Sequence, residues 1–122
     1  MQQKILVVDD DESILEVIQI VLESEGYQIQ TCQNSQCFQH FTGNLPDLIL
    51  LDILLSGEDG YEICKQLKHN QATAHIPIIM LSALSDVNEL ADVSGADDFI
   101  EKPFDIDVLI KTVERHLIPI QN

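Results

Sequence analysis

Short apolar runs alternate along this chain with longer segments in which apolar residues recur at helical spacing. The runs cover residues 4–9, 27–32, 47–52, 76–82 and 97–101. Strands that alternate with helices form βα units around a parallel sheet. The sequence therefore predicts an α/β domain with five strands and five helices in strict alternation.

The segments between the runs carry apolar stripes that predict helices. These stripes are Ile14, Leu15, Ile18, Val21 and Leu22 before Gly26; Cys37, Phe38 and Phe41 after a cap at Asn34 or Ser35; Ile63, Cys64 and Leu67 after Gly60; and Ile106, Val108, Leu109, Val113 and Leu117. Only a short helix fits between residues 85 and 94. The run 27–32 alternates polar and apolar residues, which predicts a strand at the edge of the sheet. Pro77 fits the start of its strand because proline cannot donate to a ladder.

Length and charge limit the classes of function that are open to the chain. With 122 residues it is expected to be one domain spanning 1–122. Lysine and arginine total 6 against 21 aspartates and glutamates, a net charge of −15. Such a field repels DNA and anionic lipid and favours cations and basic protein surfaces. We therefore expect no direct nucleic-acid or membrane partner.

Cysteine usage and the N-terminus indicate a cytoplasmic protein. The three cysteines, Cys32, Cys37 and Cys64, have neither disulfide-framework nor zinc-site spacing. No apolar stretch approaches the roughly 20 residues of a membrane span, and the first residues do not resemble a signal peptide. Met1 lies close to the first strand, which favours a natural N-terminus.

Three of the apolar runs end on charged residues. These are Asp9-Asp10 after the first run, Asp52 after the third and Lys102-Pro103 after the fifth. Ligands of open α/β sheets bind beyond the carboxyl ends of the strands, so we expect these side chains to meet there. Three neighbouring carboxylates repel one another unless a cation lies among them. Mg²⁺ is the natural candidate because it prefers oxygen ligands and binds phosphate oxygens.

The same residues suit phosphoryl transfer. An aspartate carboxylate can attack phosphorus and hold the product as a mixed anhydride. Lys102 would neutralise phosphoryl charge, and a cis Lys102-Pro103 bond would aim its ammonium into the site. Ser82 ends the fourth strand, where its hydroxyl could reach a phosphoryl oxygen. Simpler interpretations remain open at this point: Lys102 could pair with nearby acidic residues in solvent, and the acidic run 9–12 could serve only to begin a helix.

Four segments together resemble the receiver domain of two-component response regulators, including single-domain receivers of the chemotaxis type. They are ILVVDDDESI at 5–14, PDLILLDILLSGEDGYEIC at 46–64, IPIIMLSA at 76–83 and GADDFIEKPF at 95–104. Their order and joint occurrence cover essentially the whole chain. The resemblance implies a doubly wound, flavodoxin-like (βα)₅ fold with strand order 2-1-3-4-5.

The resemblance also implies a role for each site residue. Asp52 looks like the phosphoacceptor, and Asp9 and Asp10 look like the acidic pair of a Mg²⁺ site that Asp52 and the backbone carbonyl of Leu54 complete. Lys102 looks like the lysine that contacts the phosphoryl group. Ser82 and Phe99 resemble the two switch residues, so phosphorylation is expected to change a protein-binding surface near the fourth and fifth helices.

Departures from the family pattern lie mainly on the expected output side. Only 102 − 82 = 20 positions separate Ser82 from Lys102, which is short for the family. Leu54 and Leu84 stand where the family varies residues that modulate phosphoryl lifetime. Apolar side chains there would not position an attacking water, so we expect the phosphoryl group to have a comparatively long lifetime. Leu84→Glu should shorten this lifetime.

The implied function is a non-enzymatic phosphoacceptor. The partners implied are a histidine kinase or histidine phosphotransfer protein as donor, in a two-component system or phosphorelay, and a downstream protein target. No output domain is visible within the 122 residues, so signalling by protein contact is expected. A stand-alone receiver and the receiver of a longer protein are both compatible with the sequence.

Three other functions would each require different sequence features. A degenerate receiver that acts as a constitutive binding module is disfavoured by the complete acidic site, although the short segment of the expected fourth helix keeps this alternative open. An aspartate-nucleophile phosphatase normally needs a second acid two residues after the nucleophile, where this chain has Leu54. A nucleotide-binding domain would need a glycine-rich first loop, whereas Asp9-Asp10-Asp11-Glu12 would repel phosphates.

Overall fold

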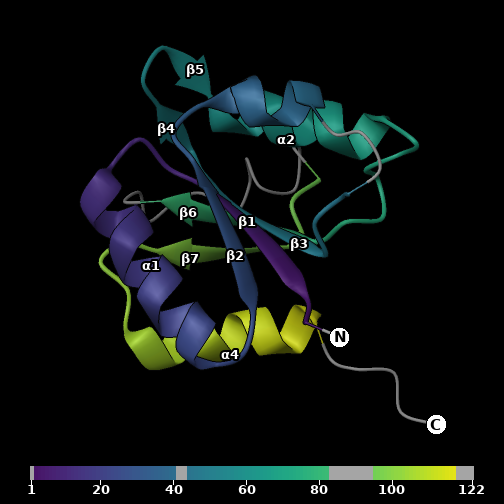
Figure 1. Cartoon of the computed structure of the whole chain (residues 1–122). Helices are drawn as coiled ribbons and strands as arrows, with labels where there is room; N and C mark the ends of the chain where they lie inside the picture. The colour runs from purple at the N-terminus through teal and green to yellow at the C-terminus, as the bar shows by residue number, and fades with distance from the viewer. Residues whose placement is uncertain (1, 41–43, 83–94, 118–122) are drawn as a thin grey trace, which may run out of the picture.

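The chain folds as a parallel sheet with helices on both faces (Figure 1). The computed structural model describes residues 2–40, 44–82 and 95–117. In order, its elements are β1 (Lys4–Val8), α1 (Glu12–Ser24), β2 (Gln28–Cys32), the 3₁₀ helix η1 (Ser35–His40), β3 (Leu48–Asp52), β4 (Leu54–Leu55), β5 (Glu58–Asp59), α2 (Gly60–His69), β6 (Ile78–Ser82), β7 (Asp98–Glu101) and α4 (Ile106–His116).

The main sheet has five strands in the order β2-β1-β3-β6-β7, and all four pairings are parallel. This is the predicted order 2-1-3-4-5, because β6 and β7 are the fourth and fifth strands along the chain that join this sheet. Every residue of β3 and β6 is buried, as expected for strands covered on both faces. β2 lies at one edge and has no fully buried residue, which confirms the interpretation of its alternating sequence.

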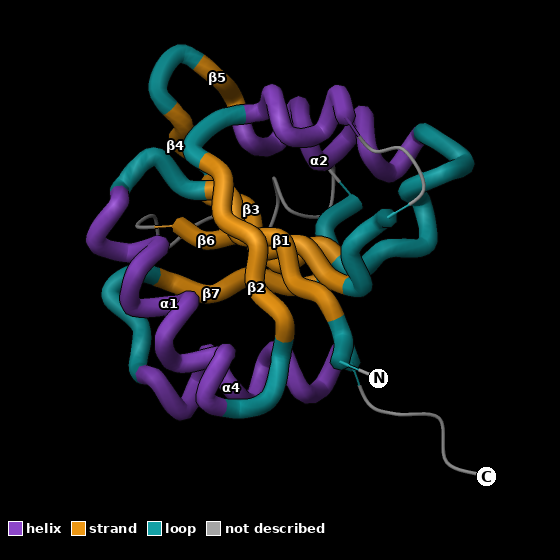
Figure 2. Tube along the Cα trace, in the orientation of Figure 1, coloured by secondary structure: helices purple, strands orange, loops and turns teal. Residues whose placement is uncertain are grey.

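Helices lie on both faces of the sheet (Figure 2), and an apolar layer holds them to each face. On one face, α1 and α4 pack Ile18, Leu22 and Leu109 onto Ile5 and Leu50. On the other face, residues of α2 and η1 pack against the alternate strand residues. Because side chains of a strand point to opposite faces in turn, each central strand contributes to both layers and is fixed in register by them.

Aspartates begin the two helices that follow strand ends near the site. The Asp11 carboxylate accepts hydrogen bonds from the backbone N–H groups of Ser13 at 2.9 Å and Ile14 at 3.4 Å. Asp59 caps α2 in the same way through the N–H of Tyr61 at 2.9 Å. Such caps satisfy N–H groups that have no partner within the helix and favour helix initiation at these positions.

A small antiparallel hairpin of β4 and β5 lies between β3 and α2. Strand β5 is attached to the start of η1 through Glu58 and Ser35. The Glu58 carboxylate accepts hydrogen bonds from the Ser35 hydroxyl and, at 3.0 Å, from the Ser35 backbone N–H. The chain then enters α2 at Gly60, whose N–H donates to the Ile53 carbonyl at 2.8 Å. The hairpin is therefore held at both ends close to the end of β3.

Several expectations for the helices are revised by the structure. The segment after Asn34 forms a 3₁₀ helix of six residues rather than an α-helix. Cys37 and Phe38 do pack against the core, as their spacing predicts. Val108 and Ile106 remain about half exposed, because the buried stripe of α4 follows Leu109, Thr112 and Val113 instead.

Two expectations fall outside the part of the chain that the structure describes. The short helix expected between residues 85 and 94 and the side chain of Phe41 both lie there. Among the described helices, none is both long and apolar enough to cross a bilayer.

Candidate functional site

The carboxyl ends of β1, β3 and β7 bring the predicted site residues together. Asp9 directly follows β1, Asp52 is the last residue of β3, and Lys102 directly follows β7. Asp9 is held at the sheet edge because its N–H donates to the Cys32 carbonyl at 3.0 Å. The Lys102 N–H donates to the Ser82 carbonyl at 2.5 Å, which continues the β6–β7 pairing by one position.

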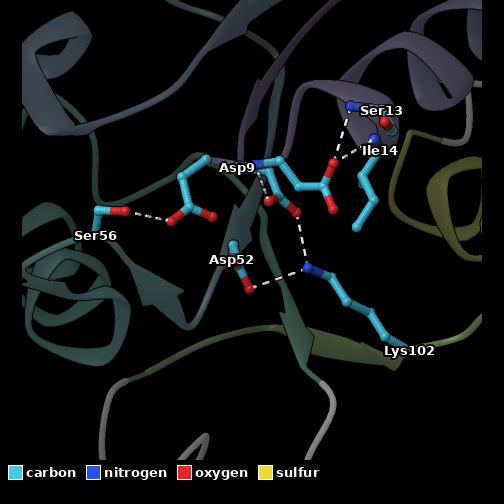
Figure 3. A network of polar contacts seen from close by, with 8 residues as sticks. Asp9, Ser13, Ile14, Asp52, Ser56 and Lys102 are labelled. Atoms are coloured by element: carbon cyan, nitrogen blue, oxygen red, sulfur yellow. Dashed lines mark hydrogen bonds and ion pairs between the residues drawn. The ribbon is translucent and has the colours of Figure 1, made fainter.

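Lys102 bridges two buried aspartates (Figure 3). Its Nζ lies 2.8 Å from Asp9 Oδ2 and 3.3 Å from Asp52 Oδ1. The side chains of Asp9 and Asp52 are 0% and 9% exposed, whereas that of Lys102 is 17% exposed. The Lys102-Pro103 peptide bond is cis. The ion pairs with two buried carboxylates favour the interpretation of Lys102 as a site residue over a lysine paired only in solvent.

Asp10 completes an acidic cluster. One carboxylate oxygen from each of Asp9, Asp10 and Asp52 lies within 4.8 Å of the others. Asp9 is further fixed by the Asp11 N–H, which donates to its Oδ1 at 2.9 Å. Asp10 is exposed, and its Oδ2 accepts a hydrogen bond of 2.7 Å from the Ser56 hydroxyl. The cluster therefore has one open side formed by Asp10.

The environment makes ionisation of Asp52 less favourable than that of an ordinary aspartate. Burial raises the pKa of Asp52 above its ordinary value, and the Asp9 carboxylate raises it further. Lys102 and a backbone hydrogen bond at Leu54 oppose these effects but do not cancel them. Burial alone would lower the pKa of Lys102, yet hydrogen bonding and attraction to Asp9 and Asp52 outweigh it and raise that pKa. Lys102 is therefore a permanent cation that only partly compensates the carboxylates.

The donor set fits a hard divalent cation. The cluster offers carboxylate oxygens only, and three carboxylates share one ammonium. Oxygen donors with excess negative charge suit Mg²⁺, which also tolerates an open side occupied by water or a phosphate oxygen.

The structure places the remaining predicted residues around this cluster. Leu54 lies in β4, two positions beyond Asp52, and the residue is 66% exposed. Ser82 ends β6 and is buried, one position beyond Leu81, the register partner of Asp52. Phe99 lies inside β7 beside Met80, and its half-buried ring packs against the core on the α2 side. Leu84 lies outside the described residues.

Two residues near the site were not predicted from the sequence. Ser56 reaches Asp10 from the hairpin, and a serine four positions after Asp52 carries no recognisable signal. Gly60 packs against the backbone of Asp52: a Cβ at this position would lie 2.3 Å from the Asp52 carbonyl oxygen. In the sequence, Gly60 indicates only where the helix begins.

Comparison with known families identifies the chain. A family model described as the response regulator receiver domain matches residues 5–114. The chain belongs to the response regulator receiver family. A receiver is a signalling phosphoacceptor and not an enzyme that turns over a substrate, which agrees with the acidic cluster described above.

Curated relatives of this receiver are longer proteins. The DNA-binding dual master transcriptional regulator RpaA of Synechocystis is 38% identical over 113 residues, covering 90% of this chain and 47% of RpaA. The DNA-binding response regulator MtrA of Mycobacterium tuberculosis is 40% identical over 120 residues, covering 96% of this chain and 51% of MtrA. The receiver thus spans about half the length of these relatives.

Solved structures match the receiver over nearly its full length. A response regulator from Chloroflexus aurantiacus has a TM-score of 0.90 and 33% identity, covering 98% of this chain and 100% of that one. The BeF₃-activated receiver domain of DrrB, a Thermotoga maritima protein, has a TM-score of 0.85 and 31% identity, with coverages of 98% and 100%. The receiver of the sensor kinase PA1611 from Pseudomonas aeruginosa has a TM-score of 0.85 and 28% identity, with coverages of 96% and 98%. That structure holds a magnesium ion in its active-site cleft.

Proposed function

We propose that this receiver takes a phosphoryl group from a phosphohistidine onto Asp52. The observation that carries the proposal is the position of Lys102, whose ammonium lies 2.8 Å from Asp9 and 3.3 Å from Asp52 at the end of β3. When Mg²⁺ offsets the charge of the carboxylates, the Lys102 ammonium can attract the oxygens of a phosphoryl group on Asp52. The magnesium-bound PA1611 receiver and the BeF₃-activated DrrB receiver support the same assignment.

The reaction follows from the positions of Asp52 and Lys102. A carboxylate oxygen of Asp52 attacks phosphorus and forms a P–O bond, while the P–N bond to the donor imidazole breaks. The electron pair of that bond goes to the imidazole nitrogen. This nitrogen takes a proton from solvent, so the leaving group is a neutral histidine side chain. Lys102 attracts the phosphoryl oxygens, which in phosphoryl transfer contributes through position and charge neutralisation.

Mg²⁺ is proposed to be held by the carboxylates of Asp9, Asp10 and Asp52 with the backbone carbonyl of Leu54. When bound, the ion offsets the negative charge of the phosphoryl oxygens and of the carboxylates. The protein prepares this site by fixing Asp9 through Lys102 and the Asp11 N–H, so that little reorganisation is needed.

Ser82 and Phe99 are proposed as the switch residues. Ser82 lies at the end of β6, adjacent to the end of β3, and we expect its hydroxyl to bind a phosphoryl oxygen on Asp52. Phe99 lies on the neighbouring strand β7, and movement of its half-buried ring would change the protein-binding surface near β7 and α4. Phosphorylation would thus be read by a downstream protein target.

The donor is proposed to be a histidine kinase or a histidine phosphotransfer protein. An apolar groove of about 410 Å³ adjoins Lys102 and is lined by Ser13, Ile14, Val17, Lys102, Pro103 and Phe104. A protein donor seated there would bring its imidazole to Asp52 over the Lys102 side of the site. We further propose that residues 1–122 form one receiver domain that acts in the cytoplasm without contacting nucleic acid itself.

The proposal is tested by phosphorylation with acetyl phosphate and Mg²⁺, followed by phosphate-affinity electrophoresis and intact-mass measurement. The wild-type protein is expected to be modified, and Asp52→Asn is expected to abolish both this modification and the response to beryllofluoride. Asp107→Asn, an exposed aspartate in the first turn of α4, serves as the matched control and should behave as wild type.

Two results would contradict the proposal. Modification that persists in Asp52→Asn would place the phosphoacceptor at another residue. A wild-type protein that remains unmodified at saturating Mg²⁺ and acetyl phosphate would instead favour a constitutive binding module.

A further inference from the structure

Ser56 contacts the exposed member of the acidic cluster from a separate element. It lies in the turn between β4 and β5, and its hydroxyl donates to Asp10 Oδ2 at 2.7 Å (Figure 3). The two residues are 46 positions apart in the sequence, so this contact is formed by the tertiary fold.

The other carboxylates of the cluster are held differently. Asp9 is buried, and both of its oxygens are engaged, by Lys102 and by the Asp11 N–H. Asp52 is fixed by its position at the end of a fully buried strand and by Lys102. Asp10 is exposed and is repelled by these two neighbours, so its side chain is favoured to turn towards solvent.

A hydrogen bond to one oxygen of Asp10 opposes this tendency. It holds the carboxylate within the cluster and leaves Oδ1 available as a ligand atom. Hydrogen bonds to a charged acceptor are stronger than those between neutral groups.

The hairpin that carries Ser56 is well placed for such a role. At β5 it is attached to Ser35 through Glu58, and beyond β5 the Gly60 N–H donates to the Ile53 carbonyl. At its start it carries Leu54, whose carbonyl is a proposed ligand. The Ser56–Asp10 hydrogen bond therefore ties one proposed ligand to the hairpin that holds another.

We propose that Ser56 is a positioning residue for the metal site: its hydroxyl holds the Asp10 carboxylate, and thereby sets the affinity of the receiver for Mg²⁺. The proposal rests on the proposed function, in which Asp10 binds Mg²⁺. Ser56 itself does not contact the phosphoryl group, so its contribution is to metal affinity and not to transfer once the ion is bound. Groups that orient a metal ligand by hydrogen bonding commonly tune metal affinity in this way.

The test is isothermal titration calorimetry of the folded protein with MgCl₂, combined with acetyl phosphate kinetics at increasing Mg²⁺. Ser56→Ala is expected to raise the Kd for Mg²⁺ by roughly three- to tenfold. This is at or below the lower end of the effects seen when a group that orients a metal ligand is removed, because Asp10 is exposed. The phosphorylation rate at saturating Mg²⁺ should stay at the wild-type value. Ser56→Thr, which keeps the hydroxyl, should restore the wild-type Kd.

Controls separate this role from a general effect on stability. Ser24→Ala removes an exposed serine hydroxyl that donates to the Val21 carbonyl at 2.6 Å, far from the site along α1, and should leave the Kd unchanged. Thermal unfolding in EDTA should be the same for Ser56→Ala and wild type. If Ser56→Ala does not fold, Ser56→Cys offers a near-isosteric side chain with a weaker donor and should raise the Kd by a smaller factor.

Several outcomes would overturn the inference. If Ser56→Ala has the wild-type Kd for Mg²⁺, the inference is overturned. Because the wild-type protein still binds Mg²⁺ in that case, the proposed function is unaffected. A lower rate at saturating Mg²⁺ with an unchanged Kd, or a failure of Ser56→Thr to restore binding, also overturns it. Absence of Mg²⁺ binding by the wild-type protein overturns the metal site and this inference together.

Discussion

At the residue scale, Asp52 is the side chain on which opposing forces meet. It must be ionised to act as a nucleophile, yet burial and the neighbouring Asp9 carboxylate raise its pKa. Lys102 reduces this penalty, but its ammonium lies closer to Asp9, at 2.8 Å, than to Asp52, at 3.3 Å. The negative charge that makes Asp52 reactive therefore lowers the stability of the folded state.

Asp52→Asn is expected to raise the free energy of unfolding at pH 7 in EDTA. Because the pKa of Asp52 is raised in the folded state, the folded state binds the proton more tightly than the unfolded state does. The stabilising contribution of the protonated Asp52 is present in acid and is lost as the pH rises through the folded-state pKa. At pH 7 the wild type therefore carries an ionised group that lowers the stability of the folded state. Urea unfolding measures the difference.

The pH dependence of that difference provides the check. The gap between Asp52→Asn and wild type should narrow as the pH falls and Asp52 becomes protonated, whereas Asp107→Asn should remain close to wild type throughout. A less stable Asp52→Asn protein at pH 7 would mean that attraction to Lys102 outweighs burial and Asp9.

At the element scale, the junction between β3 and α2 places the nucleophile. β3 is buried along its whole length between β1 and β6, and α2 begins on the backbone that follows it. Gly60 allows this approach, since a Cβ there would lie 2.3 Å from the Asp52 carbonyl oxygen and 2.8 Å from Ile53 Cα. These atoms belong to the backbone and cannot move aside as a flexible side chain would.

Gly60→Ala is therefore expected to displace the end of β3. Overpacking of this kind typically costs about 1–3 kcal/mol of stability. The same displacement should slow phosphorylation of the folded protein, because Asp52 moves relative to Lys102. Chemical unfolding and the initial rate with acetyl phosphate measure the two effects.

Gly26→Ala is the matched control for this substitution. Gly26 has a φ of +96° and nothing within 4 Å of an added Cβ. Alanine there is destabilised by the left-handed backbone conformation but meets no steric clash. It should lose stability but keep the wild-type rate of phosphorylation. A normal rate in folded Gly60→Ala would show that the position of Asp52 does not depend on this contact.

The elements differ in how far they could be predicted from the sequence. The five-stranded order agrees with expectation, and β2 lies at the edge because its alternating residues cannot be covered on both faces. Segments with strong periodicity, such as α1, begin and end near the predicted residues. The sequence predicts an ordinary helix for the segment that forms η1, because six residues do not distinguish the 3₁₀ from the α period. The two-residue strands β4 and β5 show no period at all.

The site shows the same division between local and tertiary signals. Asp9, Asp10, Asp52 and Lys102 follow apolar runs, so the sheet topology alone predicts that they converge, and the structure brings them together. Ser56 and Gly60 act on residues that are distant along the chain or packed through the backbone. Neither relation is visible before the hairpin and α2 are placed on β3.

At the scale of the whole molecule, the net charge of −15 surrounds a site that must receive an anion. Lys102 provides one positive charge at the centre, but the long-range field opposes the approach of small phosphates. A protein donor with a basic surface would instead be attracted. The field thus favours protein donors over free phosphorylated metabolites.

Monovalent salt is consequently expected to accelerate phosphorylation by acetyl phosphate at saturating Mg²⁺. Raising NaCl from roughly 20 mM to roughly 200 mM shortens the screening length and should increase the second-order rate by about two- to fivefold. Phosphoramidate, which carries less negative charge, should show a weaker dependence and serves as the control. A rate that falls with salt for acetyl phosphate would mean that local attraction to the site outweighs the molecular field.

The separation of Asp9 and Lys102 by 93 positions along the chain has a consequence for folding. Asp52 and Lys102 are likewise 50 positions apart, so the site forms only when β1, β3, β6 and β7 have assembled into the sheet. A ligand that recognises the assembled edge binds the native state alone and shifts the unfolding equilibrium in its favour. At a concentration one hundred times its Kd, such a ligand adds about 2.7 kcal/mol to the stability of the native state. Occupancy of the cluster can therefore serve as a sensitive reporter of complete sheet formation.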